Sequence, residues 1–324
     1  MLELAAIYTM RTHVNPGELL DHYQIGEVLT HTPVASIFRA TDVRTQQPVL
    51  IKIPQPDMET DPVFADRFKR EEEIGRSLDH PGLLKTLSDG AQSRLYIVMQ
   101  WFDGRLLRQV LMAEKKLPAA RAGKIVLGLC DVLDYVENHG ITHRDIRPEN
   151  ILVGDDDQIK LINFGTAGMI GARRITFAPL SQSVGASDYI SPEELSGKRG
   201  DARSDIYSVG VVLYETLTGK TPFQGIDPFD RIGKHPQPPN EIASSISPQL
   251  QEVIYRALEP APKDRYANAR QMATDLQHLD RVSVKNRTTV PDKKRRQSNR
   301  VMLYAAIALV PIAIFALLLY FAHR

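Results

Sequence analysis

The chain has 324 residues, of which 43% are hydrophobic and 24% charged, so a packed core is expected and disorder along the whole chain is excluded. Lysine and arginine total 40 against 39 acidic residues, and a net charge of +1 gives no reason to expect a nucleic-acid partner. A single cysteine, Cys130, excludes an internal disulfide and a thiolate metal site.

Residues 1–22 are predicted to form an N-terminal extension. Its first ten residues carry Glu3 where a secretory signal needs a basic segment, and Met10 is an alternative start. Four β-branched runs then predict strands at residues 23–29, 36–40, 49–53 and 95–99. One amphipathic helix is expected between them, at residues 61–78.

Beyond Asp103 and Gly104 the pattern becomes helical. Apolar periodicity predicts helices within residues 105–140, 204–218, 248–258 and 267–279, and the acidic run at 155–157 predicts a hairpin turn. The expected architecture is α+β, with a small β-rich lobe followed by a larger helical lobe. We place the connection near residues 100–104.

The C-terminal residues predict a membrane anchor. Residues 301–322 carry no charge, and as a helix they would extend about 33 Å, which is enough to cross a bilayer. A buried core helix is the alternative, but it would not need apolar side chains on every face. The linker at 281–300 is basic, so residues 293–300 could attract anionic lipid, and the large N-terminal body is expected on the cytoplasmic side of a single-pass protein.

Several motifs occur in a fixed order along the body. Residues 143–150 read HRDIRPEN, residues 163–165 read NFG and residues 191–193 read SPE, with Asp205 and Arg265 following and Lys52 and Glu71 preceding. In this order, residues 23–279 resemble the bacterial, eukaryotic-like (Hanks-type) serine/threonine protein kinases. The resemblance implies a bilobal protein-kinase-like fold over residues 23–280, with an N-lobe at 23–100 and a C-lobe at 104–280.

The resemblance also implies roles for individual residues. Lys52 and Glu71 would form an ion pair, and Asp145 would accept the proton of a substrate hydroxyl. ATP and Mg²⁺ would be the cofactors of an active enzyme, with Asn150 and, more weakly, Asn163 as metal ligands. A nucleotide would contact Leu29, Ile37, Leu50, Lys52, Met99, Gln100, Phe102 and Leu152. Structural roles fall to His143, Arg144, Glu193, Asp205 and Arg265, with Arg144 also expected to pair with a phosphate on the activation segment.

The sequence departs from the family pattern around the nucleotide. Asn163 stands where the family has a metal-binding aspartate, and this exchange removes a full negative charge beside the cation. Residues Thr30, Thr32 and Ala35 occupy the three positions of the glycine-rich loop, and Pro33 removes a backbone donor. Leu50 fills space over the adenine, and an alanine at position 186 replaces the usual threonine.

Two functions are compatible with this pattern. The first is a membrane-anchored pseudokinase that acts through protein partners, with weak or absent phosphotransfer. The alternative is an active divergent kinase that transfers the γ-phosphate of ATP to protein serine or threonine, with Asp145 as base. A phosphotransferase acting on small molecules or lipids is disfavoured by the SPE motif, and dimerisation is left open. Candidate phosphorylation sites are Thr166, Thr176, Ser181, Ser183 and Ser187.

Overall fold

The computed structural model describes residues 14–87, 92–169, 186–232 and 234–285. Within these ranges, no helix combines the length and apolar character that a membrane crossing requires. The predicted transmembrane helix at 301–322 lies outside the described residues, as do most of the basic linker and residues 1–13.

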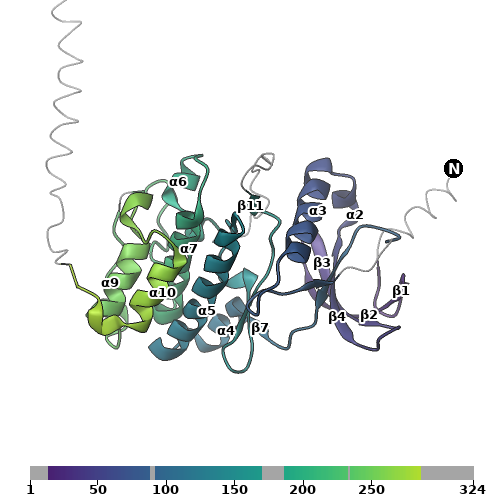
Figure 1. The fold of residues 1–324 in the computed structure, drawn as a ribbon, viewed down its shortest axis with the longest axis horizontal. Helices are drawn as coiled ribbons and strands as arrows, with labels where there is room; N and C mark the ends of the chain where they lie inside the picture. The colour runs from purple at the N-terminus through teal and green to yellow at the C-terminus, as the bar shows by residue number, and fades with distance from the viewer. Residues whose placement is uncertain (1–13, 88–91, 170–185, 233, 286–324) are drawn as a thin grey trace, which may run out of the picture. The chain divides into compact units, whose positions relative to one another are not determined.

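The N-lobe is built on a six-stranded antiparallel sheet in the order β1-β2-β3-β4-β6-β5 (Figure 1). Its strands are β1 (Leu19–Leu20), β2 (Tyr23–His31), β3 (Ala35–Asp42), β4 (Pro48–Pro54), β5 (Thr86–Leu87) and β6 (Ile97–Gln100). The four predicted strands are therefore confirmed. Alternation along β4 sends Ile51 and Ile53 into an apolar cluster on one face of the sheet, and Leu50 into a second cluster. Lys52 therefore shares a face with Leu50.

Helix α3 (Pro62–Ser77) confirms the predicted amphipathic helix and follows the single turn α2 (Pro56–Glu59). Its start is fixed by Asp61, whose side chain accepts hydrogen bonds from the N–H groups of Val63 and Phe64, with proline at the first helical position. Phe68 and Glu71 are three residues apart and both are buried, so they lie on the same face of the helix. This geometry turns Glu71 toward the sheet.

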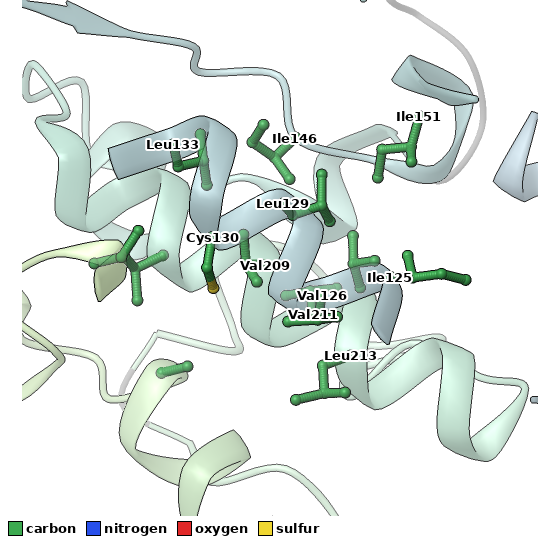
Figure 2. Packing of buried hydrophobic residues seen from close by; sticks show 14 of the residues in the cluster. Ile125, Val126, Leu129, Cys130, Leu133, Ile146, Ile151, Val209, Val211 and Leu213 are labelled. Carbon is green, nitrogen blue, oxygen red and sulfur yellow. The ribbon is translucent and has the colours of Figure 1, made fainter. Parts of the chain in front are cut away.

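The C-lobe is organised around two long helices, α5 (Ala119–Asn138) and α7 (Ala202–Thr218), which pack side by side (Figure 1). Figure 2 shows Leu129 and Cys130 of α5 facing Val209 of α7 in this core. Shorter helices complete the lobe: α4 (Leu107–Glu114), α6 (Pro192–Leu195), α8 (Pro239–Ile242), α9 (Pro248–Ala257) and α10 (Ala269–Gln277). The predicted helices at 204–218, 248–258 and 267–279 are confirmed as α7, α9 and α10.

The stretch predicted as helical from 105 to 140 is divided in three. It begins as β7 (Arg105–Leu106), continues as α4, and resumes as α5 only after Pro118. Proline disfavours the helical conformation of the residue before it, and Lys115 has a φ of 63°, so the chain turns between the two helices. The break is the main correction to the predicted secondary structure.

Short strands shape the loops between the lobes. β9 (Ile151–Val153) pairs with β7 and with β10 (Ile159–Leu161), so residues 154–158 form the predicted hairpin turn. β8 (Ile141–Thr142) pairs with β11 (Gly168–Met169). These two pairs place the HRDIRPEN loop and the NFG turn next to each other, although they are separate along the chain.

Candidate functional site

A chain of polar side chains runs from the N-lobe to the C-lobe. The Lys52 Nζ, on β4, lies 2.7 Å from both carboxylate oxygens of Glu71 on α3. The same Nζ lies 3.5 Å from the Asn163 Oδ1. The Asn163 Nδ2 donates to the Asn150 Oδ1 at 3.2 Å. The structure thus brings together four residues that are far apart in sequence.

Asp145 completes this polar chain. The Asn150 Nδ2 donates to both the main-chain oxygen and the Oδ2 of Asp145, each at 2.7 Å. Burial raises the pKa of the Asp145 carboxyl, while the charges of Arg147 and Lys52 and the hydrogen bond from Asn150 act in the opposite direction. A carboxylate in this position can accept a proton from a hydroxyl group brought beside it.

The groups that meet at residues 150 and 163 do not fit a divalent cation as they stand. Magnesium prefers oxygen ligands and is usually held by one or two carboxylates. Here the Asn163 Nδ2 is directed at the Asn150 Oδ1, which is the oxygen predicted to bind the metal. Among the described residues, no group of three or more histidine, cysteine, aspartate or glutamate side chains could hold a metal ion. The Asn150 Oδ1 is thus engaged by an amide donor, and Asn163 supplies no carboxylate.

The residues predicted to line a nucleotide fall into two groups. Leu50 and Met99 are buried in one apolar cluster, and Ile37, Phe102 and Leu152 pack against it while partly buried. Leu29 and Gln100 do not belong to this cluster: Leu29 is 41% exposed, and the N–H of Gln100 donates to the main-chain oxygen of Lys85, just before β5.

The HRDIRPEN loop (residues 143–150) is held through its main chain. The Asp205 carboxylate accepts hydrogen bonds from the N–H groups of His143 and Arg144, both at 2.7 Å. His143 is fully buried; its Nε2 donates to the Ile162 oxygen at 3.1 Å, and its Nδ1 accepts the N–H of Asp145 at 3.2 Å. Because both ring nitrogens are used, one neutral tautomer is selected. Burial raises the pKa of Asp205 to about 7 and lowers that of His143 to about 4.

We expect His143 to make the protein sensitive to acid. Its pKa in the folded protein, about 4, lies below its ordinary value of 6.5, so the unfolded chain binds the proton more readily. The stability contributed by neutral His143 is full above pH 6.5 and is lost as the pH falls toward 4, by about 3 kcal/mol. Protonation at Nδ1 would also place a donor against the Asp145 N–H.

Urea unfolding of the wild type and of His143→Gln between pH 4 and 8 measures this effect. Glutamine keeps a donor and an acceptor without titrating in this range, so the difference between the two curves separates His143 from Asp205 and other titrating groups. A difference that does not change with pH would contradict the prediction.

Glu193 and Arg265 form a buried, bidentate ion pair. The Arg265 Nη1 and Nη2 each lie 2.7 Å from one oxygen of Glu193, and the Ser204 Oγ donates to the same carboxylate at 2.6 Å. The guanidinium also donates to three main-chain oxygens and lies 4.9 Å from the centre of the Tyr207 ring. Glu193 lies on α6 and Arg265 lies in the segment before α10, so the ion pair connects these two parts of the C-lobe.

The structure contains a second ionic network that the sequence analysis did not identify. Arg108 on α4 contacts Glu149 at 2.8 Å, Glu215 on α7 at 2.7 Å and the hydroxyl of Tyr189 at 2.6 Å. Arg147 contacts the other oxygen of Glu149 at 2.8 Å. Although burial opposes the charged form, hydrogen bonds from Arg147 and Arg108 lower the pKa of Glu149 to about 2. Arg147 and Glu149 belong to the recognised motif, but nothing in the sequence marks Arg108 as their partner.

Arg144 is the residue predicted to pair with a phosphate on the activation segment. Its φ is 65°, its Nη2 donates to the Gly200 oxygen at 3.2 Å, and its guanidinium lies against the backbone of Gly168. Burial lowers its pKa, and Arg199 and Arg70 are close enough to add to this effect. The candidate sites Thr176, Ser181 and Ser183 lie outside the described residues, so the phosphate partner stays a prediction.

The remaining candidate phosphorylation sites, Thr166 and Ser187, are described. The Thr166 hydroxyl donates to the main-chain oxygen of His143 at 3.3 Å. Ser187 lies in the short helix η2 (Ala186–Tyr189), and its main-chain oxygen accepts a hydrogen bond from Arg231.

Comparison with known proteins agrees with this geometry. A family model for the protein kinase domain matches residues 23–278. PknB of Mycolicibacterium smegmatis is 33% identical over 270 residues, and PknB of Mycobacterium tuberculosis 34% identical over 270; each match covers 81% of this chain and 43% of the relative. The crystal structure of the PknI kinase domain of M. tuberculosis has a TM-score of 0.66 and 25% identity, covering 83% of this chain and 99% of that domain.

The fold and the arranged motifs define a protein kinase domain, with a β-sheet N-lobe and a helical C-lobe. The chain belongs to the protein kinase family, and the relatives it matches are bacterial serine/threonine kinases. It spans less than half the length of these curated relatives.

Proposed function

We propose that this protein is a kinase-fold signalling protein with weak or absent phosphotransfer, which acts by binding protein partners. The observation that carries the proposal is the hydrogen bond from the Asn163 Nδ2 to the Asn150 Oδ1. Phosphoryl transfer depends on cations that neutralise the charge of the triphosphate. In this chain an amide donor faces the oxygen that would bind the cation, and the carboxylate that would compensate is missing. The framework around Asp205, Glu193 and Arg265 is complete, so the fold can persist without the reaction.

The second candidate is an active divergent kinase that transfers phosphate from ATP with Mg²⁺ to protein serine or threonine. Two observations favour it: the Lys52–Glu71 ion pair at 2.7 Å, and the buried Asp145 held by Asn150. In the family pattern the first would orient the phosphates, and the second would accept the hydroxyl proton.

The proposal also includes membrane attachment through residues 301–322, with the kinase-like domain on the cytoplasmic side. The support is the uncharged run itself and the basic residues at 293–300 that precede it. We expect the full chain to stay with the membrane after alkaline carbonate extraction and a chain ending at residue 300 to be released. Release of the full chain would contradict membrane attachment through residues 301–322.

The decisive experiment separates binding from turnover. The full chain in mild detergent is heated with ATP in the presence of Mg²⁺, Mn²⁺ or EDTA, and transfer of labelled phosphate to a generic protein substrate is followed in parallel. A ligand that binds only the folded state raises stability by RT ln(1 + [L]/Kd). We expect no cation-dependent gain from ATP and no transfer above that of Asp145→Asn.

Transfer that disappears in Asp145→Asn would overturn the proposal and establish the active kinase. Stabilisation by ATP without phosphate transfer would be consistent with the proposal and would show that the protein binds a nucleotide without catalysing the reaction.

A further inference from the structure

The turn between β2 and β3 uses all of its own backbone donors. The Thr32 N–H donates to the Ala35 oxygen at 3.0 Å, and Pro33 has no N–H to offer. The N–H groups of Val34 and Ala35 both donate to the Thr32 Oγ1, at 3.4 and 3.1 Å, and this hydroxyl donates in turn to the Ala35 oxygen at 2.8 Å. The Thr32 side chain therefore occupies the two amides that a glycine-rich loop would direct at phosphate.

Gln55 fastens the same turn to the end of β4. Its main-chain N–H donates to the Val34 oxygen at 3.0 Å, and its Nε2 donates to the Thr32 oxygen at 2.9 Å. The Nε2 also lies 3.0 Å from the Oγ of Ser36, which is 8% exposed and contacts the His31 Nδ1 at 2.9 Å. The carbonyls on the two sides of Pro33 are thus held by one residue.

The closed turn lies beside the apolar cluster predicted to hold the base. Val34 and Ile37 both pack against the cluster that contains Leu50 and Met99. Lys52, the charged residue among the predicted nucleotide contacts, is already paired with both oxygens of Glu71. Apolar contacts for a base are therefore present, while the amides of Val34 and Ala35 are engaged within the turn.

We propose that Thr32 determines the ligand specificity of this site: by keeping the turn amides engaged, its hydroxyl makes the site bind an adenine nucleoside about as tightly as the triphosphate. The inference rests on the proposed function, because it assigns a ligand class to the same site. An amide–phosphate hydrogen bond is charge-assisted and stronger than a neutral one, so withholding two amides removes much of the advantage of a triphosphate.

The first test compares adenosine with ATP in EDTA, using thermal stabilisation of the full chain. In the wild type we expect the two dissociation constants to agree within about threefold. Thr32→Ala should tighten ATP binding by about fivefold or more and leave adenosine binding unchanged. Thr45→Ala is the matched control, because it removes the same atoms from an exposed turn, between β3 and β4, that contributes no residue to the predicted site.

Hydrogen exchange of the free protein provides a second test that needs no nucleotide. Peptides covering residues 32–36 should exchange slowly in the wild type and in Thr45→Ala, and about tenfold faster in Thr32→Ala. Equal exchange in the wild type and Thr32→Ala would overturn the inference, as would wild-type binding of ATP about tenfold tighter than adenosine. Binding of neither ligand would overturn the assignment of a nucleoside site. Phosphate transfer by the wild type would contradict only the proposed function, since the exchange rates do not depend on it.

Discussion

Replacing Arg265 with methionine is expected to lower the free energy of unfolding by about 3–5 kcal/mol. The Arg265 side chain is 0% exposed and its partner Glu193 is 12% exposed, so the change leaves a carboxylate without its counter-charge. Three main-chain oxygens lose their donor at the same time. Because one kcal/mol corresponds to roughly 2–4 °C in a domain of this size, the melting temperature should fall by about 6–20 °C.

Urea unfolding measures this loss, and two variants control it. Arg203→Ala removes an ion pair with Asp201 whose side chains are 38% and 55% exposed, so it should cost less than about 1 kcal/mol. Adding Glu193→Gln to Arg265→Met should recover part of the stability, because the buried charge is then removed as well. An Arg265→Met protein within about 1 kcal/mol of the wild type would show that the pair does not anchor this segment.

Replacing Asn163 with aspartate is expected to create a cation dependence that the wild type lacks. A carboxylate at this position cannot donate to the Asn150 Oδ1, so that oxygen becomes available together with the new negative charge. With cation and ADP at ten times the dissociation constant, stability should rise by about 1.4 kcal/mol. The same addition should leave the wild type within the error of the measurement.

Thermal melts with ADP and Mn²⁺, Mg²⁺ or EDTA distinguish the two proteins. Asn163→Ala is the matched control, because it removes the amide without supplying a charge. Equal cation-dependent gains for the wild type and Asn163→Asp would mean that the amide pair does not prevent metal binding, and would favour the active kinase.

Periodicity predicted most of the fold because both lobes consist of regular elements with clear apolar faces. A β-branched run identified the strand that carries Lys52, and helical spacing identified the helix that carries Glu71; that Glu71 lies on its buried side is seen in the structure. The motifs then predicted that Asn150 and Asn163 belong to the same site as Asp145, because their order along the chain resembled a known family. The structure brings Lys52, Glu71, Asn150, Asn163 and Asp145 together in one polar chain.

The features that sequence did not predict depend on contacts between distant side chains. No local pattern marks Arg108 as the partner of Glu149 and Glu215, since these residues lie on three separate elements. Gln55 was also missed, because a glutamine after a strand is usually solvated, and its role depends on the path of the preceding hairpin. The break between α4 and α5 was missed because apolar periodicity continues on both sides of Pro118.

The hydrogen bonds by which Asp205 and His143 hold the HRDIRPEN loop do not involve the side chains that would take part in a reaction. Within the described residues, the Asp205 carboxylate and the His143 ring form their hydrogen bonds with main-chain groups, those of residues 143, 144, 145 and 162. Every amino acid except proline offers the same main-chain groups, so these hydrogen bonds do not depend on which side chains the loop displays. The side chain at 145 can therefore change without loss of these hydrogen bonds, whereas Asn150 also holds the Asp145 main-chain oxygen and Asn163 has a φ of 72°, which favours asparagine or glycine.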